Sequence, residues 1–229
     1  MSSGNAGLAR GAPSWVLSPS LLGGRVWLSV EDGLRVLGVN GARTAAVDVQ
    51  VGCECEGRAS AAVEASILSS FAEPLMAASP LLDLEVSERL VVRFHAGRAF
   101  AELSLPAERE EVPLRSLPEP RLRAPAYGVF EEAERQLRRL KGSSGVRVRV
   151  RAGEGLLLVE PPRRLFKLEG APAEPLEVRV LFGDLEQVLE VFRAAGLKPQ
   201  ALWLGSRVLG LEAVAGKARA VALVAGQVE

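Results

Sequence analysis

The residues with the clearest chemical potential are cations on one predicted helix. Apolar residues at 130, 133, 137 and 140 recur at helical spacing, which places Arg135 on the opposite face, flanked by Arg138 and Arg139. Positive charge on a rigid element, without groups that read bases, is what binding to a phosphate backbone requires. Glutamates four residues before Arg135 and Arg138 allow a second interpretation, a solvated face laced by i,i+4 ion pairs.

No arrangement of side chains in the sequence suits catalysis or metal binding. His95 is the only histidine and lies in an alternating, strand-like run, which is typical of a structural residue. Cys53 and Cys55 share one face of a predicted strand, cannot close an ordinary disulfide, and lack further ligands for zinc. We therefore expect a protein that is not an enzyme, uses no cofactor or metal, and keeps two ordinary thiols in a reducing cytoplasm.

The composition limits the class of protein. With 229 residues and 48% hydrophobic content, the chain can bury the cores of two ordinary domains. The formal net charge of zero excludes a globally basic nucleic-acid-binding protein, so any DNA contact must come from local patches. No run reaches transmembrane length, and residues 1–14, rich in Gly, Ala and Ser, lack the apolar stretch of a signal peptide.

The elements that would position the cations occur twice in the same order, about 120 residues apart. The copies are strand, turn and strand at 26–39 and 146–159, a helix at 67–72 and 184–192, and closing strands at 97–105 and 216–224. This order indicates a duplicated β-α-β domain, and chance alignment of short apolar runs is the alternative. Residues 106–125, between the copies, carry five prolines among charges, which is typical of an exposed linker.

This order of elements resembles that of the trimeric DNA sliding clamps, proliferating cell nuclear antigen (PCNA) and its archaeal relatives. Residues 31–49 resemble the family segment in which Asp-Gly starts a strand and a Met-Asp-x-x-His-Val turn follows. Residues 209–212 and 220–229 resemble the family's PLKLEY strand and its closing FLAP-K/R-I/V-E motif, with Glu229 as the most specific match. Asn40 and Arg43 replace the usual Asp and His, and Gly226-Gln227 replaces Pro-Lys/Arg, so the resemblance is to a divergent subunit.

The resemblance implies an α+β fold of two similar clamp domains, with inner helices against outer antiparallel sheets, joined by an interdomain connector. The expected segments are a flexible tail at 1–14, domain one at 15–106, the connector at 107–121 and domain two at 122–229. Homologous subunits, in a homo- or heterotrimer, would close head to tail into a ring around duplex DNA. The ring would be cytoplasmic and nucleoid-associated.

Three sets of contact residues follow from the resemblance. Non-specific contacts to double-stranded DNA would come from Arg135, Arg138, Arg139, Lys141, Arg193 and Lys198. Edge strands would pair between subunits through Ala99, Ala101, Leu103, Leu105, Leu176, Val178 and Val180. Partner peptides would bind Val39, Asn40, Arg43, Thr44, Val112, Leu114, Leu117, Val224, Ala225, Gly226 and Val228.

The implied function is that of a processivity factor in DNA replication and repair. Short peptide motifs of DNA polymerase, clamp loader, nuclease or ligase would dock on the ring, and no membrane would be involved. The alternative is a checkpoint-like or regulatory clamp-fold protein-binding module that no longer encircles DNA. The short first inner helix at 18–24 and the lack of cations in the helix at 67–78 favour that alternative.

Overall fold

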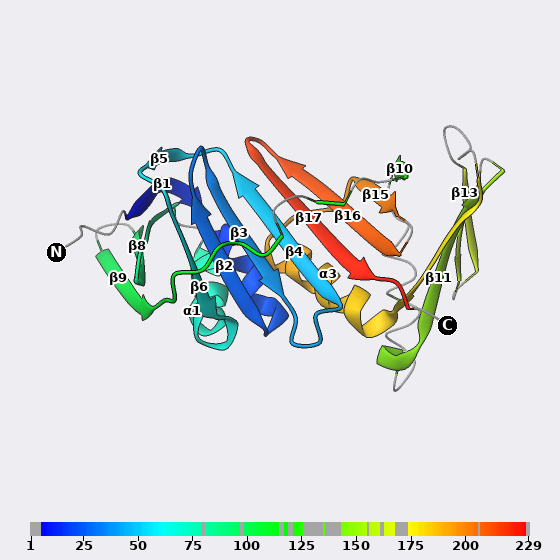
Figure 1. Cartoon of the computed structure of the whole chain (residues 1–229), viewed down its shortest axis with the longest axis horizontal. Helices are drawn as coiled ribbons and strands as arrows, with labels where there is room; N and C mark the ends of the chain where they lie inside the picture. Colours follow the sequence, from blue (N-terminus) through cyan, green and yellow to red (C-terminus); the bar gives the residue numbers. More distant parts are fainter. Residues whose placement is uncertain are drawn as a thin grey trace.

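The structure is a computed structural model of the whole chain. It describes residues 6–78, 81–96, 99–114, 117–118, 121–125, 135, 143–154, 156–160, 163–167, 174–205 and 207–227. The molecule is elongated, with β9 near one end of the long axis and β13 near the other (Figure 1). Within the described residues, no helix is both long and apolar enough to span a membrane.

The first copy of the repeat runs from β1 to β9. Its elements are β1 (Gly7–Pro13), the 3₁₀ helix η1 (Ser14–Leu22), β2 (Arg25–Val30), β3 (Leu34–Val39), β4 (Ala45–Val51), β5 (Glu54–Glu56), β6 (Ala59–Glu64), α1 (Ala65–Ala78), β7 (Leu81–Val86), β8 (Arg89–Ala96) and β9 (Ala99–Pro106). The second copy comprises β10 (Leu122–Pro125), η2 (Ser143–Gly145), β11 (Arg147–Gly153), β12 (Leu156–Glu160), β13 (Arg164–Lys167), β14 (Leu176–Leu181), α3 (Phe182–Ala194), β15 (Ala201–Leu204), β16 (Val208–Ala215) and β17 (Ala218–Ala225).

The sheet topology confirms the duplication. The strand order β6-β2-β3-β4 in the first copy matches β14-β11-β12-β13 in the second, and β1-β7-β8-β9 matches β10-β15-β16-β17. Antiparallel pairing of β17 with β4 joins one block from each copy into an eight-stranded sheet. The two copies are therefore connected by main-chain hydrogen bonds as well as by the connector.

The helices and the connector lie on opposite faces of the eight-stranded sheet (Figure 1). Inward-facing side chains of its strands, such as Leu28 and Val47, are buried in one core with Leu17 of η1 and Phe192 of α3. A Cβ atom on Gly38 would lie 2.2 Å from the Pro19 carbonyl oxygen, so glycine is needed for η1 to pack directly on β3.

The N-terminal region differs from the flexible tail that the sequence predicts. Gly7–Pro13 form β1, which pairs with β5 and β7 in the five-stranded sheet. Two glycines and a proline conceal this strand in the sequence, and its register shifts between Ala9 and Ala12 around Gly11, whose φ is +68°. Its pairing partners lie more than 40 residues away, so local sequence does not reveal it.

Candidate interaction surfaces

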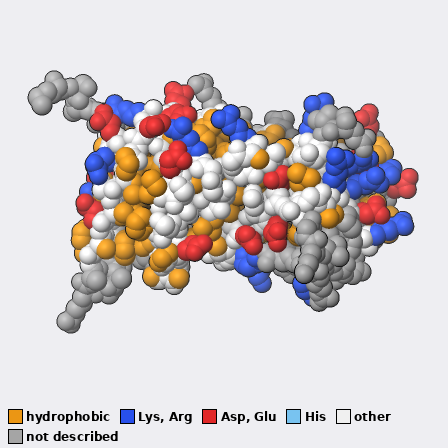
Figure 2. Space-filling model, turned by 90° about the horizontal axis from the view of Figure 1, so that it is seen from below, with side chains coloured by type: hydrophobic (Ala, Val, Ile, Leu, Met, Phe, Trp, Pro, Cys, Tyr) orange, Lys and Arg blue, Asp and Glu red, His pale blue; other side chains and the backbone are white. Residues whose placement is uncertain are grey.

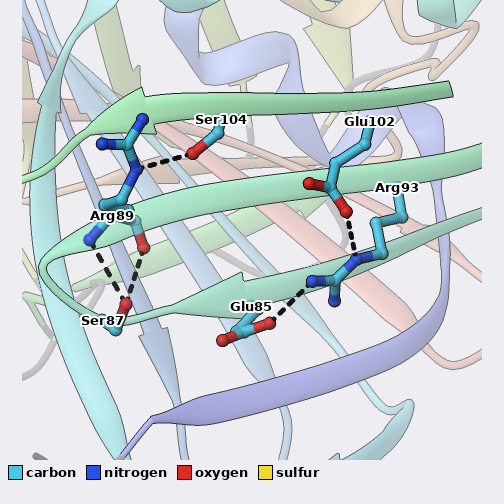
Figure 3. Close-up of polar contacts among 6 residues, drawn as sticks. All are labelled: Glu85, Ser87, Arg89, Arg93, Glu102 and Ser104. Carbon is cyan, nitrogen blue, oxygen red and sulfur yellow. Dashed lines mark hydrogen bonds and ion pairs between the residues drawn. The ribbon is translucent and has the colours of Figure 1, made fainter.

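Strand β9 is a firmly held edge strand of the five-stranded sheet. On its outer face, Arg93 donates to Glu102 at 2.8 Å and to Glu85 at 3.0 Å, and Arg89 donates to Ser104 at 2.7 Å (Figure 3). The hydrogen bonds that Arg93 donates to Glu102 and Glu85 raise the pKa of Arg93 above its usual value. These contacts tie β9 to β8 and, through Arg93, to β7.

The free side of β9 presents main-chain hydrogen-bonding groups. Ala107 N–H donates to the Glu88 carbonyl at 3.1 Å, so Glu88 and Ala107 form a hydrogen-bonded pair. Hydrogen-bonded and non-hydrogen-bonded pairs alternate along an antiparallel ladder, so the odd-numbered residues of β9 bond to β8. The N–H and C=O groups of residues 102 and 104 therefore point away from β8, where no described strand pairs with them. Of the predicted interface residues on β9, Ala101 and Leu103 are half-buried and Leu105 is buried, and the side chain of Ala99 lies outside the described residues.

An apolar surface accompanies this edge. Ile67 and Phe71 on α1 are 42% and 41% exposed, and Figure 2 shows hydrophobic side chains gathered at this end of the molecule. When the first residues of α1 and α3 are aligned, Ile67 corresponds to Asp184 and Phe71 to Val188. Both equivalents are buried in α3, which packs on β4 of the first copy. The exposed pair on α1 thus occupies positions that are covered where the two copies meet.

The structure corrects the expectation for Leu176, Val178 and Val180. Their strand, β14, corresponds to β6 of the first copy, and Val178 and Val180 are buried in the chain's own core. On the outer side of β14, the Arg179 carbonyl accepts the Gln227 N–H at 2.7 Å. The strand that corresponds to β4 is instead β13, at the other edge of the four-stranded sheet.

The predicted DNA contacts are partly described. Arg135, Arg193 and Lys198 are exposed, whereas Arg138, Arg139 and Lys141 lie outside the described residues. Arg193 occupies the last turn of α3, where a cation also complements the helix dipole. The equivalent helix α1 carries Glu73 and no cation, so these basic residues belong to the second copy alone.

Asn40 has a structural role that the sequence interpretation missed. It is 5% exposed, and its Oδ1 accepts the N–H groups of Thr44 at 2.9 Å and Ala45 at 3.1 Å. Its Nδ2 lies 3.3 Å from Asp184 Oδ1 and 3.1 Å from Gln187 Oε1 of α3. Asn40 therefore fixes its own turn and links the first copy to the second, so its side chain is not open to a partner peptide.

The remaining predicted pocket residues divide between two places. Near the turn, the Ala225 N–H donates to the Thr44 carbonyl at 2.7 Å, and Val39 and Gly226 are half-buried beside them. Val224 points into the core and is fully buried. Arg43 is exposed at the turn, Leu114 and Leu117 are half-buried in the connector, and Val228 lies outside the described residues.

Val112 lines a different, polar cleft. This cleft of 660 Å³ lies beneath the connector, at the ends of β3 and β4 opposite the Asn40 turn. Its lining includes Arg35, Gln50, Lys217 and Arg219 from the sheet and Glu111 from the connector. The predicted single apolar pocket is therefore not assembled as one site in the described residues.

Two buried carboxylates organise the outer face beside this cleft. Arg35 binds Asp48 in a bidentate manner, with its Nε 2.9 Å from Oδ1 and a terminal nitrogen 2.8 Å from Oδ2. Glu212 accepts the indole N–H of Trp203 at 3.0 Å and the Nε of Arg219 at 2.8 Å. The sequence signal for both is an acidic residue at an outward position of an otherwise apolar strand.

The two cysteines contact each other without forming a recognisable site. Their Sγ atoms are 3.4 Å apart. Burial, followed by the hydrogen bond with Cys53, raises the pKa of Cys55 to about 12.

The sequence matches no protein-family model and no curated protein. Two solved structures match almost the whole chain. PCNA of A. fulgidus, solved with the C-terminal region of FEN-1 bound, has a TM-score of 0.68 and 16% identity, covering 98% of this chain and 99% of that chain. PCNA from Thermococcus kodakaraensis has a TM-score of 0.69 and 15% identity, covering 96% and 100% respectively.

The chain has the PCNA clamp fold. The matches span both copies of the repeat, so the α+β architecture of two clamp domains expected from the sequence is confirmed. In this PCNA fold the eight-stranded sheet is the place where the two domains meet.

Proposed function

We propose that the protein is a non-enzymatic subunit of a ring-shaped sliding clamp that encircles duplex DNA. It would tether DNA polymerase and other replication and repair proteins, acting as a processivity factor in the cytoplasm at the nucleoid. The observation that carries this proposal is a PCNA fold over almost the whole chain, with sheet edges at both ends of its long axis that no described strand pairs with. A contact between different surfaces at opposite ends is heterologous, and it gives a ring when its rotation closes.

The internal repeat supports a specific pairing of strands between neighbouring subunits. Inside the chain, β17 pairs with β4, and the equivalents of these two strands are β9 and β13. In the proposed ring, β9 of one subunit therefore pairs with β13 of the next subunit, which leaves neither edge strand exposed. The apolar pair Ile67 and Phe71 would be covered at this junction, as Asp184 and Val188 are covered inside the chain.

The inner surface of the ring would bind the phosphate backbone without reading sequence. Arg135, Arg193 and Lys198 are exposed cations of the second domain, and Arg138, Arg139 and Lys141 would extend them. Because α1 offers no cation, we expect each subunit to contact DNA mainly through its second domain.

Partner peptides would dock beside the Asn40 turn and the residues after β17. The A. fulgidus PCNA structure, which has the C-terminal region of FEN-1 bound, supports this class of contact for the fold. Val39, Thr44, Ala225 and Gly226 would form the docking edge, and polymerase, clamp loader, nuclease and ligase are the partners we expect.

The test is retention on circular DNA. We expect the protein, alone or with homologous subunits, to form a trimer that is retained on nicked circular DNA and released once the DNA is linearised. Charge reversal at Arg193 and Lys198 should weaken retention and leave the trimer intact. A protein that stays monomeric in every mixture would refute the ring.

A second candidate is a checkpoint-like or regulatory protein-binding module with the clamp fold that does not encircle DNA. The apolar, cation-free face of α1 favours it, because that helix would offer DNA no positive charge. Peptide binding without any retention on circular DNA would select this function.

A further inference from the structure

Four arginines lie together on the outer face of the four-stranded sheet. Arg147, Arg149 and Arg151 occupy alternate positions of β11, opposite the buried side chains of that strand, and Arg179 pairs with Arg149 from β14. Alternate residues of a strand lie about 6.7 Å apart, so the three guanidinium groups form a row. Figure 2 shows Lys and Arg side chains gathered at this end of the molecule.

Only part of this positive charge is neutralised within the chain. Arg149 lies 3.3 Å from Glu177 and 3.8 Å from Glu160, and Arg179 lies 2.8 Å from Glu177. Among the residues that the structure describes, none forms an ion pair with Arg147 or Arg151.

Leucines border the arginines on the same face. The register places Leu158 opposite Arg151 and Leu165 opposite Leu158, and Leu156 opposite Gly153. Leu156 is 43% exposed and Leu165 is 57% exposed. The face thus combines a row of cations with an apolar margin, and it carries no aromatic side chain among its described residues.

The equivalent face of the first domain is already occupied by the connector. Arg25 on β2 is the counterpart of Arg147, because each pairs with the residue that directly precedes the long helix of its domain. Glu110 of the connector lies 2.9 Å from Arg25, and Glu108 also forms an ion pair with it. Figure 1 shows the connector crossing β2 and β3 on this side.

In both domains, the segment that follows the last strand forms a main-chain hydrogen bond at the edge of the sheet that carries this face. In the first, Glu108 and Ala62 exchange main-chain hydrogen bonds of 2.8 and 2.9 Å at the edge of β6. In the second, Gln227 N–H donates to the carbonyl of Arg179, the counterpart of Ala62. The described residues after β17 reach Gln227, and none of them crosses the arginine row.

We propose that this arginine face binds an extended acidic segment of a partner protein that also carries apolar residues. The acidic groups would pair with Arg147 and Arg151, as Glu108 and Glu110 pair with Arg25, and the apolar groups would pack on Leu156 and Leu165. The connector supplies the chemistry of the occupant, since its sequence combines Glu108, Glu110 and Glu111 with Val112 and Leu114. Nucleic acid fits this face less well, because single strands bind through aromatic stacking and phosphates make no use of exposed leucines.

The experiment uses the connector sequence as a probe. A fluorescent peptide of residues 107–117 is titrated with the whole protein at low salt and followed by anisotropy. The comparison probes are the same peptide with its three glutamates replaced by glutamine, and a single-stranded oligothymidylate. The connector's own site in the first domain is occupied intramolecularly at high effective concentration, so binding of the probe reports on the second domain.

We expect the acidic peptide to bind, and the glutamine peptide and the oligonucleotide to bind at least several-fold more weakly. The double variant R147E/R151E should weaken the acidic peptide about ten-fold or more, since opposite charges become like charges. The variant K217E, which reverses an exposed cation elsewhere, should change nothing, and L165S, which removes an apolar contact, should weaken binding of the acidic peptide. If the charge reversal disturbs folding, the double variant R147Q/R151Q, which only removes the two charges, serves in its place and should also weaken binding of the acidic peptide.

Three results would overturn the proposal: no binding of the acidic peptide, tighter binding of the oligonucleotide, or equal losses in R147E/R151E and K217E. The assay does not depend on ring formation, because the face lies within one chain. A negative result here therefore leaves the proposed clamp function intact, and a failure of ring assembly leaves this surface testable.

Discussion

The role assigned to Asn40 can be tested by replacing it with alanine. In Asn40→Ala the N–H groups of Thr44 and Ala45 lose the Oδ1 acceptor that they share. Asp184 also loses its described donor at Oδ1, and its Oδ2 is already buried without a described partner. The substitution thus removes polar contacts at the site where the first domain meets α3.

The expected loss follows from these contacts. A buried donor left without its acceptor costs about 1–3 kcal/mol. The Ala45 N–H is buried and the Thr44 N–H is half-buried and accessible to water, so we expect a loss of about 2–4 kcal/mol in the free energy of unfolding. For a chain of this size that corresponds to a fall in Tm of roughly 5–15 °C.

Thermal and urea unfolding, followed by tryptophan fluorescence and circular dichroism, measure this loss. The matched control is Gln187→Ala, which removes a single contact at 3.1 Å from an exposed side chain and should cost less than about 1 kcal/mol. Hydrogen exchange should also become faster in β4 and in α3 of Asn40→Ala. Equal stability of Asn40→Ala and the wild type would show that water replaces the amide, and the reasoning would be wrong.

Three further predictions concern the edge, the inner surface and the thiols. In Ser104→Pro the chain loses an outward N–H of β9, so assembly should fail in sedimentation experiments while the fold persists; Ser104→Ala, which keeps that N–H, should assemble. Charge reversal at Arg193 and Lys198 should lower retention on circular DNA at least several-fold and flatten its salt dependence, and unchanged retention would exclude them as contacts. Because its pKa is raised to about 12, Cys55 should be alkylated slowly at pH 8 and faster as pH rises; Cys53→Ala removes two causes of the shift, the hydrogen bond and the charge interaction with Cys53, and should speed labelling, as mass spectrometry would show.

Much of the fold could be predicted because its signals are local. The hairpin of β2 and β3 follows from alternation around Glu31-Asp32-Gly33, and the end of α3 from Gly196, whose φ is +67°. The start of α3 differs from the sequence prediction, which begins the helix at residue 184: the helix begins at Phe182, and Leu181 caps it without a side-chain hydrogen bond. Such boundaries depend on how the chain leaves β14, which local sequence does not encode.

The candidate site was harder to predict because its chemistry depends on side-chain contacts that form only in the folded chain. A turn residue such as Asn40 reads as exposed, and only the approach of α3 buries it. Asp48 and Glu212 read as surface charges on strands, yet Arg35 and Arg219 cover them. The partners of Asn40 on α3 lie far from it in sequence, whereas Arg35 and Arg219 lie on the strands that neighbour Asp48 and Glu212. Composition and periodicity reveal neither kind of contact.

The choice of edge strand shows the same limit and how internal symmetry overcomes it. Alternation marks both β13 and β14 as strands, and nothing local says which one has a free side. The structure decides this through a single hydrogen bond from Gln227 to Arg179 and through the pairing of β17 with β4. Strand β9 is the equivalent of β17, and β13 is the equivalent of β4. The pairing of β17 with β4 inside the chain is therefore the template for the pairing of β9 with β13 of the neighbouring subunit in the proposed ring.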